Sequence, residues 1–274
     1  MILINNLQSD ILENIGRFKF LTTSQIQRIT GKSLSYVREN LSLLSQNNYI
    51  KTYRIEKFIK AENMYYLTEK GKDIIVSHEK IFAEDIKLPV GVPLVVKDFQ
   101  HRKNFIDIHI ALHYHLQNLQ DKEIQIHKFY AYFDKVGNNR TAHNLESQTK
   151  ISLSDNQFFM PDGVMITIDE NEEKNLYLIE MYNGKDTIRT LQQLAKHSKA
   201  IALGTPAQKF GIQKNPTILC VFEYESSKQA VIKRLQANER FTPVADFFFF
   251  ISLEDMRKDF ISAWYNLKGK GLNF

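Results

Sequence analysis

Apolar side chains recur at helical spacing near the start of the chain. The first set is Ile11, Leu12, Ile15 and Phe18, and the second is Ile26 and Ile29. The spacing predicts two short helices within residues 9–30, the second capped by the side-chain oxygen of Thr22 or Thr23. Each helix would bury one face against the other.

A third and longer helix is predicted after Gly31, which permits a tight turn, with Ser33 as its cap. Its buried stripe consists of four apolar residues: Leu34, Val37, Leu41 and Leu44. The opposite face is polar and carries Ser35, Arg38, Glu39 and Ser42, with Tyr36 at its flank. The helix is therefore amphipathic, with Asn47 and Asn48 at its end.

Two strand-like segments follow this helix. Residues 49–55 and 64–67 are rich in β-branched and aromatic side chains, and the turn between them is polar. Thr68 is placed to cap a fourth helix. Three helices, a hairpin and a closing helix are the elements of a winged helix-turn-helix.

The end of the hairpin supports this interpretation. The segment Tyr66-Leu67-Thr68-Glu69-Lys70-Gly71 resembles the Y-x-L-T-x-x-G pattern that ends the wing in many bacterial winged-helix proteins. A helix of this length fits the major groove, where its first polar residues would face base edges. Double-stranded DNA is thus the expected partner, with Arg38 as the candidate for a guanine contact.

The predicted DNA-binding residues lie on the third helix and on the hairpin: Ser33, Ser35, Tyr36, Arg38, Glu39, Ser42, Arg54, Lys57 and Lys60. The three cations of the hairpin would contact phosphates, which positions the protein without specifying a sequence. The alternative is a protein-docking or dimerisation module, in which the polar face of the helix is simply solvated. Glu39, which would repel phosphate, favours that alternative.

A proline-rich segment separates two parts of the chain. Each proline in Leu88-Pro89-Val90-Gly91-Val92-Pro93 removes a backbone donor and biases its predecessor to extended geometry. The sequence therefore predicts a winged-helix domain at 1–80, a linker at 81–98 and a second domain at 99–274.

The second domain alternates between helical and strand-like patterns. The predicted helices are 101–119 and 187–202, with Thr187 as a cap, and a helix that opens at Ser226-Ser227; the predicted strands are 124–133, 158–168, 175–182, 216–224 and 246–252. Residues 136–155 are polar and irregular. The fold class is two-domain α+β or α/β, and the second domain is a mixed sheet flanked by helices.

Histidines cluster on the first helix of this domain, namely His101, His109, His113 and His115. His109 and His113 share a face, but no glutamate lies between them as in a metalloprotease helix. They are interpreted as scattered surface or half-buried side chains, and no metal is expected there.

Two acids on successive strands carry the candidate chemistry of the second domain. Asp162 follows Pro161, and Glu180 lies near the end of the next strand. Such carboxylates can converge on Mg²⁺, which prefers oxygen ligands. The element order over residues 100–255 and these acids resemble the PD-(D/E)XK nuclease superfamily, in which the second acid belongs to a Glu-x-Lys triplet.

The chain departs from that superfamily at the lysine. The triplet here is Glu180-Met181-Tyr182, and a neutral phenol cannot stabilise phosphorane charge as an ammonium does. An inactive nuclease-like domain without catalytic residues, metal or cofactor is expected. In the alternative, Asp162 and Glu180 bind Mg²⁺ and a displaced lysine, Lys185 or Lys196, completes an active site.

Both acids also have structural interpretations. Asp162 can form an Asp-Gly turn at the edge of a strand. Glu180 can form an ion pair with Lys185, Arg189 or Lys196.

The combination of parts is more specific than either part. A winged helix, a helix that begins with His101-Arg102-Lys103-Asn104, then Pro161-Asp162-Gly163 and a strand ending in Glu180, resembles the replication-relaxation family of plasmids and other mobile elements. Family members commonly carry an aspartate where a nuclease has lysine, and Tyr182 departs from that too. The resemblance implies a DNA-binding accessory role at an origin of transfer or replication, with a relaxase or another relaxosome protein as partner. A second copy of the chain is a further possible partner, in a homodimer. A winged-helix transcription regulator is the alternative function.

Charge and composition agree with this organisation. Residues 1–80 carry a net charge of +4 and the remainder +1, within a total of +5, which suggests that the front of the chain meets a polyanion. A single cysteine, Cys220, excludes a disulfide framework and a cysteine-rich zinc module. No apolar run reaches the ~18 residues that span a bilayer, and Met1 to Leu7 lacks the pattern of a signal peptide. A cytoplasmic protein without a membrane partner is expected.

Overall fold

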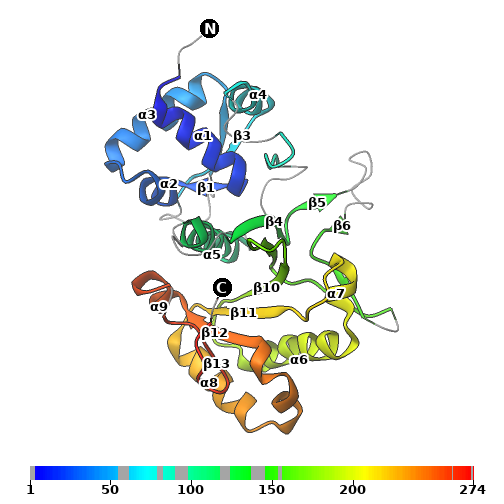
Figure 1. Ribbon diagram of the computed structural model, residues 1–274. Coiled ribbons are helices and arrows are strands. Elements are labelled where there is room, and N and C mark those ends of the chain that lie inside the picture. The colour runs from blue at the N-terminus through cyan, green and yellow to red at the C-terminus, as the bar shows by residue number, and fades with distance from the viewer. Residues whose placement is uncertain are drawn as a thin grey trace. The chain divides into compact units, whose positions relative to one another are not determined.

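The computed structural model describes residues 4–54, 62–78, 83–89, 98–117, 124–136, 146–153, 156–260, 262–272 and 274. The chain divides into two compact units, residues 1–110 and 111–274. Figure 1 shows the elements of each. No helix of the described part is long and apolar enough to cross a bilayer.

The N-terminal unit has the topology that the sequence predicts for a winged helix. Its helices are α1 (Asn6–Phe18), α2 (Thr23–Thr30), α3 (Leu34–Gln46), α4 (Glu69–Ser77) and the first part of α5 (Phe99–Gln117). Its strands are β1 (Leu21–Thr22), β2 (Ile50–Tyr53) and β3 (Met64–Leu67), which pair antiparallel in the order β1-β3-β2. Among the described residues of this unit, the two-residue strand β1 is an element that the sequence analysis did not anticipate.

Local signals set most of these boundaries. Thr22 caps α2 through a capping box with Gln25, which resolves the choice between Thr22 and Thr23. The apolar face of α1 is buried as expected, with Ile11, Leu12 and Ile15 fully inaccessible. Ile29 of α2 and Leu34 of α3, which were expected inside, are only half-buried.

The turn from β3 into α4 explains the motif recognised in the sequence. The Thr68 N–H donates to the Tyr49 carbonyl (3.1 Å), and the Thr68 hydroxyl accepts from the Gly71 N–H (3.1 Å). A Cβ at Gly71 would lie 2.1 Å from the Tyr49 carbonyl oxygen, so only glycine fits. Thr68 and Gly71 therefore hold the start of α4 against Tyr49, the residue that precedes β2.

The boundary between the units differs from the predicted linker. The N-terminal unit extends into α5, up to residue 110, rather than ending at residue 80. Part of the predicted linker also packs on α1, because the Lys87 N–H donates to the Gly16 carbonyl (2.9 Å) and Ile86 is buried. Residues 90–97, which include Pro93, lie outside the described residues.

The C-terminal unit is built on a six-stranded mixed sheet in the order β13-β12-β11-β10-β9-β4. Its strands are β4 (Gln125–Ala131), β9 (Gly163–Ile168), β10 (Lys174–Tyr182), β11 (Thr217–Phe222), β12 (Phe248–Ser252) and β13 (Tyr265–Asn266). β4, β9 and β10 form an antiparallel meander, and β10, β11 and β12 are parallel. The predicted mixed sheet is confirmed.

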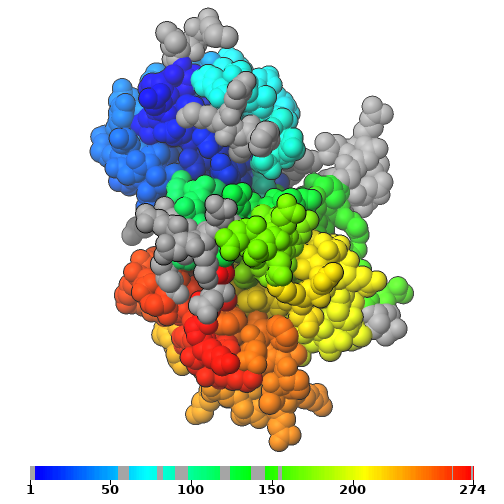
Figure 2. All heavy atoms as spheres, viewed as in Figure 1, coloured from blue at the N-terminus to red at the C-terminus, as the bar shows by residue number. Residues whose placement is uncertain are grey.

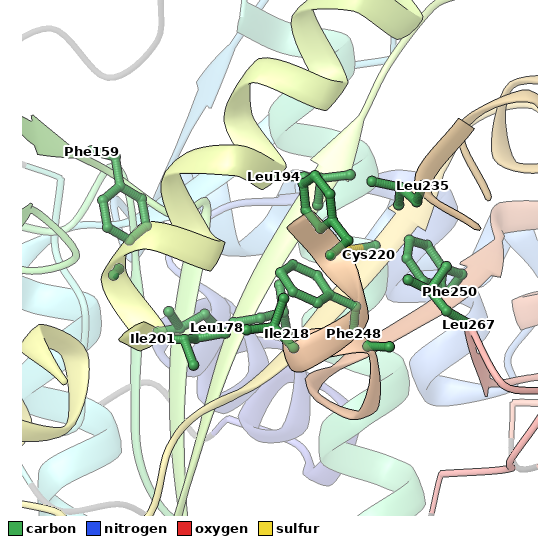
Figure 3. Packing of buried hydrophobic residues seen from close by; sticks show 14 of the residues in the cluster. Phe159, Leu178, Leu194, Ile201, Ile218, Cys220, Leu235, Phe248, Phe250 and Leu267 are labelled. Carbon is green, nitrogen blue, oxygen red and sulfur yellow. The ribbon is translucent and has the colours of Figure 1, made fainter. Parts of the chain in front are cut away.

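Helices flank this sheet, and short strands occupy the predicted irregular region. The helices are α6 (Thr187–Leu203), α7 (Thr205–Phe210), α8 (Glu225–Gln236), α9 (Leu253–Lys258) and a 3₁₀ helix (Glu239–Phe247). The short strands are β5 (Lys135–Val136), β6 (Glu146–Ser147), β7 (Ile151–Ser152) and β8 (Phe158–Phe159). Figure 3 shows side chains of α6, α8 and the strands meeting in one apolar core.

Several boundaries in this unit differ from the predictions, and the predicted strand 158–168 is two strands, β8 and β9, in different sheets. Asp186, not Thr187, caps α6 by accepting from the Arg189 N–H (3.0 Å). α8 begins at Glu225, one residue before the predicted serines, without a side-chain cap. β12 begins at Phe248 because a 3₁₀ helix occupies the residues before it.

Candidate nucleic-acid interface

α3 is the second helix of a helix-turn-helix, and two residues fix its start. Gly31 takes the left-handed conformation (φ +64°) and its N–H donates to the Gln27 carbonyl (2.9 Å), which ends α2. The Ser33 side chain then accepts from the Tyr36 N–H (3.4 Å) and begins α3. The turn between them leaves Lys32 and Ser33 exposed.

Buried contacts set which face of α3 is open. Val37, Leu41 and Leu44 are at most 2% exposed and pack inward. Asn40 is also buried, where its amide donates to the Tyr36 carbonyl (2.8 Å) and its oxygen accepts from the Asn5 amide (3.3 Å). This second bond ties α3 to the start of α1 and fixes its rotation.

The predicted contact residues of α3 all lie on its exposed face: Ser35, Tyr36, Arg38, Glu39 and Ser42. Leu43, which the sequence analysis did not single out, shares this face and is 41% exposed. In Figure 2 residues 25–50 (lighter blue) form an outer surface of the N-terminal unit. The structure thus brings these residues together on one accessible helix face.

The adjoining hairpin adds positive charge. Lys51 and Arg54 are exposed on and after β2, whereas Lys57 and Lys60 lie outside the described residues. Between residues 31 and 54 the charged side chains are Lys32, Arg38, Glu39, Lys51 and Arg54, a net charge of +3. Such a surface attracts a polyanion despite Glu39.

The base of the hairpin is held by an acid that sequence reasoning missed. Glu62 accepts from the Ser24 N–H (3.1 Å) and from the Lys103 ammonium (2.9 Å). Burial raises the pKa of Glu62, but the bonds from Lys103 and Ser24 outweigh it and leave this pKa below its usual value. α2, the hairpin and the first part of α5 are therefore linked by one carboxylate.

In the C-terminal unit the two acids singled out in the sequence lie on neighbouring strands. Ile179 pairs with Gly163 in the β9–β10 register, so Asp162 and Glu180 follow at the same end of the ladder. The Met181 N–H donates to Asp162 Oδ2 (2.7 Å). The side-chain carboxylate of Asp162 thus accepts a hydrogen bond from the backbone of the neighbouring strand.

Glu180 is bonded to a histidine. Its Oε1 lies 2.5 Å from His197 Nε2 on α6, and the two side chains are 5% and 0% exposed. The three cations considered as alternative partners of Glu180, namely Lys185, Arg189 and Lys196, are exposed. His197 escaped the sequence analysis, although a histidine on the apolar stripe of Leu194 and Ile201 is a detectable signal.

Burial dominates the electrostatics of this pair. It lowers the pKa of His197 to about 3, although the Asp162 carboxylate acts in the opposite direction. The edge of the His197 ring also packs on Phe159, with ring centroids 4.7 Å apart. The histidine is thus a neutral, enclosed partner of Glu180.

Tyr182, the last residue of the Glu180-Met181-Tyr182 triplet, is part of the core. Its ring packs against Phe222 with centroids 5.0 Å apart, and its hydroxyl has no hydrogen-bond partner among the described residues. Burial first, then the carboxylate of Glu180, raises the pKa of the phenol well above its usual value. Tyr182 therefore supplies neither a charge nor a proton donor to solvent.

The lysines proposed as substitutes are both on the surface. Lys185 lies over the Tyr224 ring at 5.6 Å, and Lys196 is exposed on α6. Within the described ranges no three His, Cys, Asp or Glu side chains are grouped so as to hold a metal ion.

The fold and the exposed helix face define a two-unit protein with a winged-helix N-terminal part. The replication-relaxation family model matches residues 12–199, more than two thirds of the chain. The chain belongs to the replication-relaxation family.

Comparison with solved structures finds partial matches among bacterial regulators. FabT of Streptococcus pneumoniae in complex with DNA is 26% identical over 28% of this chain and 53% of that chain, with a TM-score of 0.26. ZitR of Lactococcus lactis is 23% identical over 27% and 55%, with a TM-score of 0.25. MarR of E. coli is 15% identical over 43% and 78%, with a TM-score of 0.27. The chain matches about half the length of the first two. No curated protein matches it.

Proposed function

We propose that this chain is a sequence-specific, double-stranded DNA-binding accessory protein of a plasmid or mobile element, acting at an origin of transfer or replication. The observation that carries the proposal is the exposed polar face of α3, fixed in rotation by Asn40 and flanked by the cations of β2. Membership of the replication-relaxation family supports the setting.

The contacts divide by chemistry. Arg38, near the start of α3, is the residue placed to reach a base edge, where a guanidinium binds guanine through two hydrogen bonds. Lys32, Lys51 and Arg54 are exposed and would bind phosphates, as would Lys57 and Lys60, which lie between β2 and β3 in the sequence. Ser33, Ser35, Tyr36 and Ser42 complete the surface.

The C-terminal unit is proposed to support binding without catalysis. Its order α5, β4, β9, β10, α6, β11 supports a PD-(D/E)XK-like fold, with a strand meander followed by a parallel strand. The proposed lack of catalysis is supported by Tyr182, because a buried tyrosine stands where the nuclease superfamily has its lysine. A relaxase, another relaxosome protein or a second copy of the chain is the proposed protein partner of this unit.

Duplex binding is tested with the full chain and origin fragments from its own replicon. Tight binding relative to shuffled fragments is expected, and the association constant should fall steeply with salt, with a log–log slope of about −0.9 for each phosphate contact. Equal affinity for origin and shuffled duplexes would contradict the sequence-specific part of the proposal. An absence of duplex binding at low salt would contradict all of it.

Arg38→Ala is expected to relax base preference at one position of the site. The loss should be about 1–3 kcal/mol against the preferred base pair, because a bidentate contact to guanine is removed. Competition binding with single-base variants of the site measures this. Lys258→Ala, an exposed lysine of α9, is the matched control and should leave the preference unchanged.

A Mg²⁺-dependent endonuclease is the competing activity, favoured by the proximity of Asp162 and Glu180 on neighbouring strands. Mg²⁺ would polarise a phosphate and activate water. The donors fit this metal poorly, however, since Glu180 is enclosed with His197 and Asp162 accepts from the Met181 N–H. Incubation of supercoiled DNA with the protein and Mg²⁺ or Mn²⁺ should leave it intact, whereas cleavage abolished by Asp162→Ala would establish the nuclease.

A further inference from the structure

α6 has an unusual charge pattern for an exposed helix. Its 17 residues include Arg189, Lys196 and Lys199 but no Asp or Glu. The nearest carboxylate in the sequence, Asp186, lies before the helix and is engaged in capping it. The helix therefore carries only positive charge.

The three cations lie on one face. Arg189, Lys196 and Lys199, with Gln192 between them, follow helical spacing and the cations are all exposed. The opposite face is buried, and Figure 3 shows Leu194 and Ile201 of α6 among the core side chains. We call Arg189, Lys196 and Lys199 the α6 basic face.

The cations of the α6 basic face lack acidic partners. In the part of the chain that the structure describes, none of the three forms an ion pair, and Lys199 donates only to the neutral amide of Gln157 (3.2 Å). Three other exposed lysines of this unit are each paired with an acid: Lys214 with Glu173, Lys258 with Glu254 and Lys268 with Asp246. An uncompensated row of cations is suited to an extended anionic partner.

We propose that the α6 basic face is a second duplex-DNA contact, which binds the phosphate backbone without reading sequence. The cations span ten residues of helix, about 15 Å, a length over which one strand of B-DNA presents about four phosphates. DNA is favoured over an acidic protein because the polar Gln192 lies between the cations, whereas the exposed apolar residues of α6, Ile188 and Leu203, lie toward the two ends of the helix. Charge complementarity between the α6 basic face and the phosphate backbone is thus the main physical basis of the proposed contact.

This inference rests on the proposed function, since it assumes a duplex as ligand, and the experiment separates the two. The full chain with Arg189→Gln, Lys196→Gln and Lys199→Gln is compared with wild type in binding to the origin duplex over a salt series. The slope of log affinity against log salt should become shallower by about 2.7, because each lost phosphate contact removes about 0.9. The discrimination between origin and shuffled duplexes should persist.

The matched control is the triple variant Lys214→Gln, Lys258→Gln and Lys268→Gln, which changes the net charge equally at acid-paired positions. Its slope should remain that of wild type. Equal changes in both triples, or no change in the α6 triple while wild type binds duplex, would overturn the inference and leave the proposed function standing. Failure of wild type to bind duplex would overturn both. The three single variants, each expected to change the slope by about 0.9, give the same answer if the triple does not fold.

Discussion

Gly71→Ala is expected to destabilise the winged-helix unit by about 3 kcal/mol or more, at the upper end of the range for overpacking. The added Cβ would lie 2.1 Å from the Tyr49 carbonyl oxygen, and this atom belongs to the backbone, which cannot rotate away. The same carbonyl accepts from the Thr68 N–H, so a shift that relieves the clash would break the bond that starts α4. Thermal or urea unfolding of the full chain measures the loss.

Asp73→Ala is the control for this substitution. Asp73 is exposed on the same helix, and alanine there meets no neighbour, so stability should change by less than about 0.5 kcal/mol. DNA binding should weaken in Gly71→Ala, because the hairpin that flanks α3 depends on this turn. A Gly71→Ala protein as stable as Asp73→Ala would show that Tyr49 and Gly71 are not in contact.

His197→Ala is expected to destabilise the C-terminal unit by about 1–3 kcal/mol, since it removes a buried hydrogen-bond partner of the Glu180 carboxyl. His197→Gln should be milder at neutral pH because an amide N–H can still donate to Glu180. Denaturant unfolding followed by fluorescence of the buried Trp264 reports on this unit. Equal stability of the alanine and glutamine variants would contradict a bond between the two side chains.

The same pair gives a pH prediction. The pKa of His197 is about 3 in the folded chain and 6.5 in the unfolded chain, so between these values the unfolded state binds the extra proton. The part of the free energy of unfolding that depends on neutral His197 is complete above pH 6.5. It is lost as the pH falls toward 3, by up to about 1.4 kcal/mol per pH unit. The slope should be smaller in His197→Gln, and unchanged in His78→Gln, whose histidine is exposed. Parallel pH profiles for wild type and His197→Gln would contradict the prediction.

The sequence predicted those elements whose signals are local. α3 has a capping serine, an apolar stripe and a terminating asparagine pair, and its observed bounds agree with the prediction. β3 and β10 likewise follow from β-branched and aromatic runs. β1, with two residues, and α7 and α9, with six each, are too short to show a period and were missed.

The features that could not be predicted from the sequence depend on contacts between residues far apart in the chain. The partners of Glu180 were sought among nearby cations, but the strand directs its carboxyl under α6, where the buried His197 bonds to it. The prolines suggested a free linker, yet Ile86 and Lys87 pack on α1. The exposure of the α3 face could be predicted from amphipathicity, whereas its fixation by Asn5 and Asn40, 35 positions apart, could not.

Tyr182 also limits how this scaffold could be re-engineered. A lysine substituted there would bring its ammonium into the space now filled by a phenol against Phe222, where burial disfavours the charged form although the Glu180 carboxylate acts in the opposite direction. A lysine introduced at this one position would thus lower the stability of the fold before it could contribute a charge to any chemistry. A designer would have to hollow out the neighbouring aromatic layer and admit water first.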